Sequence, residues 1–149
     1  MLTLRAYIGA NAGTESAAQT AVYLGNTDTL NSGNSVAPGT FSYERWLALK
    51  VDSPPVSGVT NFWFQNAGTL PSGVTLRFGV TDLPTTPVSS QSSVATTELV
   101  PGRRYIFDTN TYTDAGEKTR YLVLQLQALI TADGGAIEQQ TPSIGWSET

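Results

Sequence analysis

The sequence predicts an all-β domain, an antiparallel β-sandwich of jelly-roll type with about eight strands. Apolar and polar residues alternate with a period of two over most of the chain, which is the pattern of half-buried strands. Turn-forming residues recur between these stretches at fairly even spacing, and no segment has convincing helical periodicity. The 149 residues are an ordinary length for one domain, so we expect residues 1–149 to form a single domain.

The first third of the chain contains two expected strands before the first long one. Residues 1–8 alternate, with the apolar side chains at even positions on one face. Residues 9–19 are small and polar and predict a loop or one weak helical turn. A short strand follows at 20–25, and Asn, Gly and Pro residues predict turns over 26–39. Residues 41–51 then form the first long strand, which contains Glu44.

The middle and end of the chain continue the same pattern. Strands are expected over 59–66 and 74–81, which alternate clearly. Residues 82–97 are rich in Ser, Thr and Pro and predict a long surface loop, a class of segment that is usually functional or mobile. Further strands are expected at 103–108 and at 120–131, the longest apolar element.

The last part of the chain combines a hairpin signal with a tail. Asp133-Gly-Gly135 is typical of a tight hairpin turn, and residues 136–140 can form the strand after it. The tail over 141–149 contains Ile144 and Trp146, an apolar pair that must dock somewhere. It either completes an edge strand of its own sheet or reaches a neighbouring subunit by strand addition.

Composition restricts the chemistry of the chain. The sequence contains no Cys and no His, which removes thiolate chemistry, the usual general base near neutral pH and the commonest metal ligands. The balance of 8 Lys/Arg against 12 Asp/Glu gives a net charge of −4, which is unfavourable for nucleic acid and for anionic membranes. We therefore expect no enzyme activity, no cofactor and no metal. No targeting signal or membrane span is visible, so synthesis and folding in a cytoplasm are expected.

Carboxylates offer two candidate sites, each with a simpler interpretation. The run from Asp108 to Glu117 superficially resembles a calcium loop, but Tyr112 and Thr113 occupy positions that such a loop gives to an oxygen ligand and to glycine. A polar hairpin connection is the simpler interpretation. A glycosidase needs two facing carboxylates. Nearly all acids here fall in turns or at strand ends, and Glu44 alone lies well inside an expected long strand.

Two tryptophans form the main candidate contact site. Trp46 and Trp63 both fall on the polar faces of their expected strands. If these strands pair as a hairpin, the two indoles lie near each other on an outer sheet face. That face is either covered by a loop, or open as a protein contact, or a platform for sugar rings. Arg103-Arg104 opens a strand and is interpreted as a surface charge pair.

Two stretches of the chain resemble small virion proteins of tailed bacteriophages. They are Phe41-Ser-Tyr-Glu-Arg-Trp-Leu-Ala-Leu-Lys-Val51 and Val59-Thr-Asn-Phe-Trp-Phe64, separated by a Ser/Pro/Gly turn. Within that class the chain is most similar to capsid decoration (cement) proteins. The resemblance covers about 25 residues and contains no functional motif.

The resemblance implies a structural role. Such a protein adds to the outside of an assembled icosahedral head, binding the major capsid protein and itself as a homo-oligomer such as a trimer. The expected function is therefore non-enzymatic stabilisation of a phage capsid, and the expected location is the outer surface of the virion. The interface residues that we single out are Trp46, Trp63, Ile144 and Trp146. The alternative function is a carbohydrate-binding β-sandwich module of a tail fibre or a cell surface.

Overall fold

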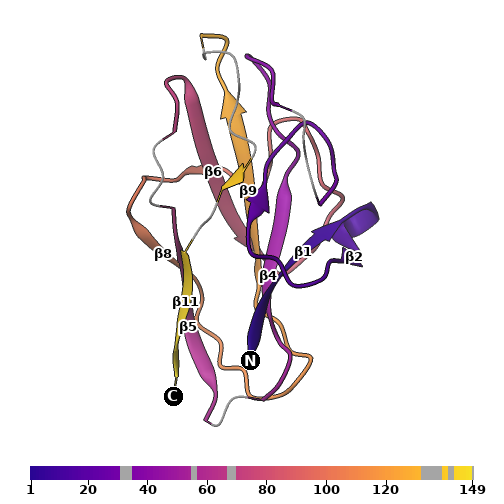
Figure 1. Ribbon diagram of the computed structural model, residues 1–149, viewed down its shortest axis with the longest axis vertical. Helices are drawn as coiled ribbons and strands as arrows, with labels where there is room; N and C mark the ends of the chain where they lie inside the picture. Colours follow the sequence, from indigo (N-terminus) through magenta and orange to yellow (C-terminus); the bar gives the residue numbers. More distant parts are fainter. Residues whose placement is uncertain (31–34, 55–56, 67–69, 132–138, 141–142, 149) are drawn as a thin grey trace.

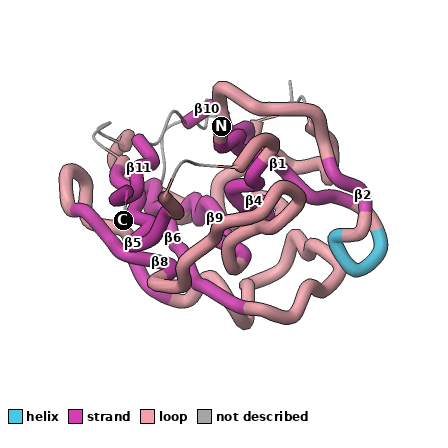
Figure 2. The backbone as a smooth tube through the Cα atoms, turned by 90° about the horizontal axis from the view of Figure 1, so that it is seen from below, coloured by secondary structure: helices cyan, strands magenta, loops and turns pink. Residues whose placement is uncertain are grey.

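The computed structural model describes residues 1–30, 35–54, 57–66, 70–131, 139–140 and 143–148. Within these residues the chain is an antiparallel β-sandwich with one short 3₁₀ turn, η1, over Ala10–Ala12 (Figure 1). The strands are β1 (Leu2–Ile8), β2 (Thr14–Glu15), β3 (Val22–Tyr23), β4 (Arg45–Val51), β5 (Val59–Gln65), β6 (Val74–Thr81), β7 (Thr97–Glu98), β8 (Arg104–Asp108), β9 (Tyr121–Ala128), β10 (Gln139–Gln140) and β11 (Ser143–Glu148). Figure 2 shows η1 at the edge of the molecule next to β2.

The strands form two main sheets and a two-stranded ribbon. The larger sheet has the order β2-β1-β4-β9-β6-β7, the smaller has the order β11-β5-β8, and β10 pairs with β3. All of these pairs are antiparallel. The all-β sandwich prediction is confirmed. The described strands make sheets of six, three and two strands and not the two four-stranded sheets of a jelly roll, so that part of the prediction is not confirmed.

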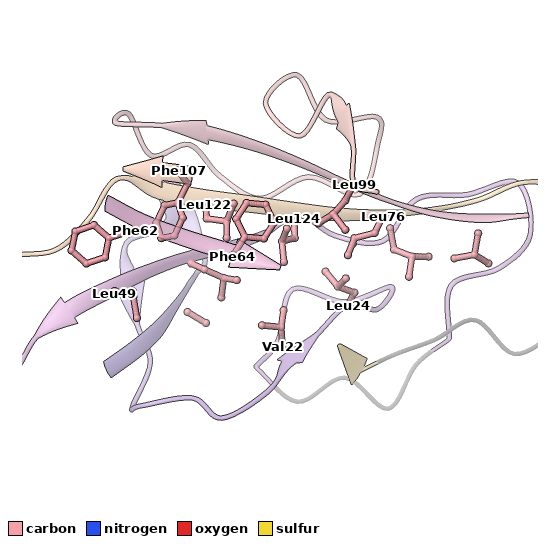
Figure 3. Close-up of a cluster of buried hydrophobic side chains, with 14 of the residues drawn as sticks. Val22, Leu24, Leu49, Phe62, Phe64, Leu76, Leu99, Phe107, Leu122 and Leu124 are labelled. Carbon is pink, nitrogen blue, oxygen red and sulfur yellow. The ribbon is translucent and has the colours of Figure 1, made fainter. Parts of the chain in front are cut away.

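The main core lies between the two large sheets (Figure 3). Leucines from β4 and β9 point toward phenylalanines from β5 and β8, because alternate residues of each strand face inward. Phe64 packs against Phe107 and Phe78 with ring centroids 6.1 and 5.1 Å apart. The even positions of β9 face this core, as the alternation predicts. The buried core side chains that Figure 3 labels are Val22, Leu24, Leu49, Phe62, Phe64, Leu76, Leu99, Phe107, Leu122 and Leu124.

The six-stranded sheet is buried on its outer face as well. A second apolar cluster contains Trp46, which is 0% exposed, and Ala95 from the 82–97 loop. One row of cross-strand neighbours crosses this face: Tyr7, Trp46, Val123 and Gly79. The Trp46 ring meets Tyr121 at 5.5 Å between centroids. The 82–97 loop therefore folds back over the sheet as a third layer.

Two buried polar side chains hold this loop in place. The Gln125 side-chain oxygen accepts a hydrogen bond from the Ser92 amide at 2.9 Å, and its nitrogen donates to the carbonyls of Ser42 and Ser90 at 3.0 and 2.7 Å. The Glu44 carboxylate accepts hydrogen bonds from the Ser92 hydroxyl and from the Val88 amide. These bonds satisfy loop backbone groups that would otherwise be buried without partners, which is why a long loop can lie on a sheet.

Gly79 shows how closely the loop approaches the sheet. A Cβ built at this position would lie 1.8 Å from the carbonyl oxygen of Val94. Gly79→Ala is therefore expected to lower the free energy of unfolding by about 2 kcal/mol, since the loop backbone must move away. Urea unfolding measures the change. Gly102→Ala is the control. No atom would contact a Cβ there, and only the left-handed φ of 81° disfavours alanine, so the free energy of unfolding should fall by about 1 kcal/mol. An unchanged or more stable Gly79→Ala protein would contradict the close packing.

Several sequence expectations are corrected by this arrangement. β4 begins at Arg45 and not at residue 41, because the amides of Tyr43 and Glu44 donate to the carbonyls of Gly25 and Val88 and not to β9. Glu44 thus precedes the strand and does not lie inside it. β4 and β5 belong to different sheets, so they form no hairpin. The turn at residues 133–135 lies outside the described residues.

Candidate contact surface

The outward side of the three-stranded sheet carries an exposed aromatic and basic surface. Phe62 and Phe64 of β5 face the core, so Trp63 between them faces outward. Its cross-strand neighbours are Ile106 on β8 and Gly145 on β11. We use the name Trp63 face for Trp63, Ile106 and Arg104. Arg103, the residue immediately before β8, lies over Tyr105, whose ring packs against the core, so its guanidinium is at the exposed end of β8 and not on this face.

Trp63 is held between groups from both neighbouring strands. The guanidinium carbon of Arg104 lies 3.7 Å from the centroid of the indole, a short cation–π contact that covers one face of the ring. On the β11 side, a Cβ built at Gly145 would lie 2.2 Å from Cζ2 of Trp63. The indole thus lies directly against Gly145, and glycine is needed there for lack of space.

The remaining side chains of this sheet add apolar area and charge. Ile106 is 62% exposed and Trp146 of β11 is 38% exposed. The Arg103 guanidinium lies over the Tyr105 ring at 5.2 Å from its centroid. Trp, Tyr and Arg are the residue types that dominate the binding energy of protein interfaces. The surface therefore has the composition of a protein contact.

The sequence analysis singled out four interface residues, and the structure separates them. Trp46 is completely buried under the 82–97 loop, so the expectation of an exposed contact residue is wrong there and the loop-cover interpretation holds. Trp63 is partly exposed on the opposite sheet, so the two indoles do not share a face. In the tail, Ile144 packs against the main core and Trp146 stays exposed.

The tail docks on its own sheet. β11 pairs antiparallel with β5, with Ile144 opposite Phe64 and Gly145 opposite Trp63, and the register shifts between Gly145 and Ser147. This confirms the own-sheet alternative for the described part of the tail. Residues 141–142 and 149 lie outside that part.

The Asp108–Glu117 segment uses its carboxylates internally. Asp108 accepts hydrogen bonds from the Asn110 amide, the Tyr112 hydroxyl and the Arg120 amide at 2.7–2.8 Å. The bond to Asn110 is an Asx turn, as expected of a polar connection. Glu117 accepts bonds from the amides of Thr113 and Asp114, and these bonds lower its pKa. Both carboxylates act as turn-forming acceptors.

Tyr112 makes this segment sensitive to alkaline pH. Burial, with the hydrogen bond to Asp108, raises the pKa of Tyr112 to about 12 from an ordinary value of 10.0. The protonated Tyr112 hydroxyl therefore contributes fully to the stability of the folded state below pH 10, and this contribution is lost as the pH rises toward 12. Tyr112→Phe keeps the ring contact with Phe62 and should make stability decline less steeply in this window. Urea midpoints at successive pH values measure the slope, and parallel curves for both proteins would contradict the prediction.

Three cations on or next to the six-stranded sheet differ from Arg104 of the Trp63 face because they are paired with acids. Lys50 binds Glu15 at 2.7 Å and Arg120 binds Asp82 at 2.8 Å. Arg5 binds Asp52 at 3.0 Å. The hydrogen bond from Lys50 is the main cause of the lowered pKa of Glu15. These charges are satisfied within the chain.

Neither a pocket nor a group of three or more metal-ligating side chains is found in the part of the chain that the structure describes. Glu44, the acid considered for a catalytic pair, is buried, and both of its carboxylate oxygens accept hydrogen bonds from the 82–97 loop. No helix among the described residues is long and apolar enough to cross a membrane.

No family model, curated protein or solved structure matches this chain. The candidate site therefore depends on the geometry alone. Sequence reasoning found Trp63 and Trp146 but did not use Ile106 and did not connect Gly145 with Trp63. Arg103-Arg104 was treated only as a charge pair. The available signal was the alternation of β8, which puts Arg104 and Ile106 on the same face.

Proposed function

We propose that this chain is a non-enzymatic structural protein of a bacteriophage particle that binds the outside of the assembled capsid and stabilises it. The observation that carries the proposal is the Trp63 face, an exposed aromatic and basic surface on a rigid sheet. The resemblance of the β4 and β5 sequences to small virion proteins supports it, as does a sequence without His or Cys. The chain is made in the host cytoplasm and ends on the virion surface.

The stabilising effect follows from mass action. A subunit that binds the assembled shell but not its separated parts lowers the free energy of the shell by its own binding free energy. Many weak contacts add through the symmetry of the lattice, and a homo-oligomer such as a trimer adds avidity. No bond is made or broken in this mechanism, so no cofactor is required.

Co-sedimentation tests the proposal. Purified protein is mixed with heads of the phage that encodes it, prepared without this chain, and the heads are pelleted. We expect the protein to pellet with the heads in a saturable manner. If it stays in the supernatant while the heads pellet, the proposed function is wrong.

Carbohydrate binding is the second candidate, favoured by the exposed edges of Trp63 and Trp146. Arg104 already covers one face of the Trp63 ring, so a sugar would need the other face or would have to displace the guanidinium. This candidate predicts that oligosaccharides change the tryptophan fluorescence and that Trp63→Ala abolishes the change. Fluorescence that does not respond to sugars, in a protein that pellets with heads, would reject it.

A further inference from the structure

The Trp63 face is a positively charged region on an acidic protein. The chain has a formal net charge of −4, yet Arg104 lies on this face and Arg103 immediately precedes it at the end of β8. Both side chains are exposed. The local charge of this face is thus opposite in sign to that of the molecule as a whole.

The two guanidinium groups have no acidic partner among the described residues. The salt bridges in that part of the chain involve Arg5, Lys50 and Arg120. Arg103 and Arg104 instead lie over the rings of Tyr105 and Trp63. Stacking holds a guanidinium in place but leaves its N–H donors available in the plane of the group. Arg104 is therefore preorganised to bind a carboxylate on the Trp63 face, and Arg103 adds positive charge at the adjacent end of β8.

We infer that the Trp63 face binds a protein surface that presents carboxylates beside apolar side chains. The inference rests on the proposed function and states which face meets the shell and what the shell must offer there. The Arg104 guanidinium pairs with a carboxylate, Arg103 attracts acidic groups at the adjacent end of β8, and Ile106 and the exposed part of Trp63 supply apolar contact. An acidic partner repels the rest of this molecule, so the charge distribution also fixes the orientation of docking.

Two other occupants fit the charges less well. Nucleic acid binding draws its affinity from several phosphate contacts, and the face offers Arg104, with Arg103 beside it at the end of β8, on a chain of net charge −4. A second copy that docked through the same face in a two-fold dimer would bring the two copies of Arg104 onto one interface, since a two-fold interface is self-complementary. Like charges opposed in this way are unfavourable.

Binding to an immobilised random copolymer of glutamate and tyrosine tests the inference directly, because the copolymer offers carboxylates and apolar rings. We expect the wild-type protein to bind at low ionic strength and to dissociate as salt is added. The double variant Arg103→Glu/Arg104→Glu should bind at least about tenfold more weakly. Ile106→Ser, which leaves the charge unchanged, should weaken binding about threefold. All three side chains are exposed, so circular dichroism and urea midpoints should show an unchanged fold.

The matched control is Lys50→Glu/Arg120→Glu, which changes the net charge by the same amount but alters paired cations of the other sheet. It should weaken binding less than about threefold. The inference is overturned if the control loses as much affinity as the face variant, or if the wild-type protein does not bind the copolymer. It is also overturned if an oligo(dT) strand competes better than soluble polyglutamate, or if the wild type self-associates and the face variant does not.

Co-sedimentation with heads separates this inference from the proposed function. If the wild type, the control and the face variant all pellet with heads equally, the proposed function stands and the Trp63 face is not the contact. If the wild type binds the copolymer through this face but does not pellet with heads, the proposed function fails and the interaction surface stands. Loss of head binding in the face variant alone supports both.

Discussion

Replacing Gln125 by methionine is expected to lower the free energy of unfolding by about 4 kcal/mol and the melting temperature by about 10 °C. Methionine has a similar length but cannot hydrogen bond to the Ser92 amide or to the carbonyls of Ser42 and Ser90. Gln125 is 0% exposed, so water cannot replace the lost partners unless the loop lifts away. Urea unfolding measures the loss, and faster thermolysin cleavage within residues 82–97 reports release of the loop.

Gln127→Met is the matched control for this prediction. Gln127 lies two residues further along β9 on the same face, is half-buried, and accepts a hydrogen bond from Arg77 at 3.3 Å. Its replacement should cost less than about 1 kcal/mol. Equal losses at the two positions would show that the Gln125 network does not hold the loop.

Trp46→Ala is the second substitution with a large expected effect, a loss of about 4 kcal/mol. The side chain is buried between Tyr7, Val123 and the covering loop, and its removal leaves a cavity that the neighbouring β-strands cannot close. The indole nitrogen has no hydrogen-bond partner within the described residues, so Trp46→Phe removes an unsatisfied donor and should cost clearly less.

The same substitution at Trp63 provides the comparison. Trp63→Ala should cost about 1 kcal/mol, since the ring is partly exposed and packs on one side only of its sheet. Acrylamide quenching gives an independent measurement: the fraction of tryptophan emission that acrylamide cannot reach should disappear with Trp46→Ala and persist with Trp63→Ala. The opposite order would mean that Trp46 is the exposed residue.

The alternation of residues predicted most strands to within a few positions. It predicted them because the inner faces of β1, β4, β5, β6 and β9 pack against one common core, and a side-chain period of two decides which residues face it. It did not predict the third layer. On β4 and β9 both faces are buried. Trp46 lies on the face of β4 that has the more polar sequence, and this pattern fits an exposed tryptophan as well as one covered by a loop. The register that places Gly79 under Val94 depends on long-range pairing.

The candidate site was only partly predictable for a related reason. Trp63 and Trp146 were recognisable from residue type alone, because large aromatic side chains outside the core pattern are uncommon. The stacking of Arg104 on Trp63 depends on β8 pairing with β5, and the contact with Gly145 depends on β11 pairing on the other side. Strand order in a sandwich is not encoded locally, so neither contact could be derived from spacing.

The order β11-β5-β8 also has a consequence for how the chain folds. The β5–β8 pairing spans roughly 40 residues of sequence, as the β1–β4 and β6–β9 pairings do, whereas β11 is synthesised roughly 80 residues after β5. Pairing over such sequence separations makes folding slow, on the order of milliseconds to seconds. We therefore expect the β11–β5 pairing to be the last of these pairings to form, so that truncation before residue 143 would leave β5 as an exposed edge strand and Trp63 without its contact with Gly145.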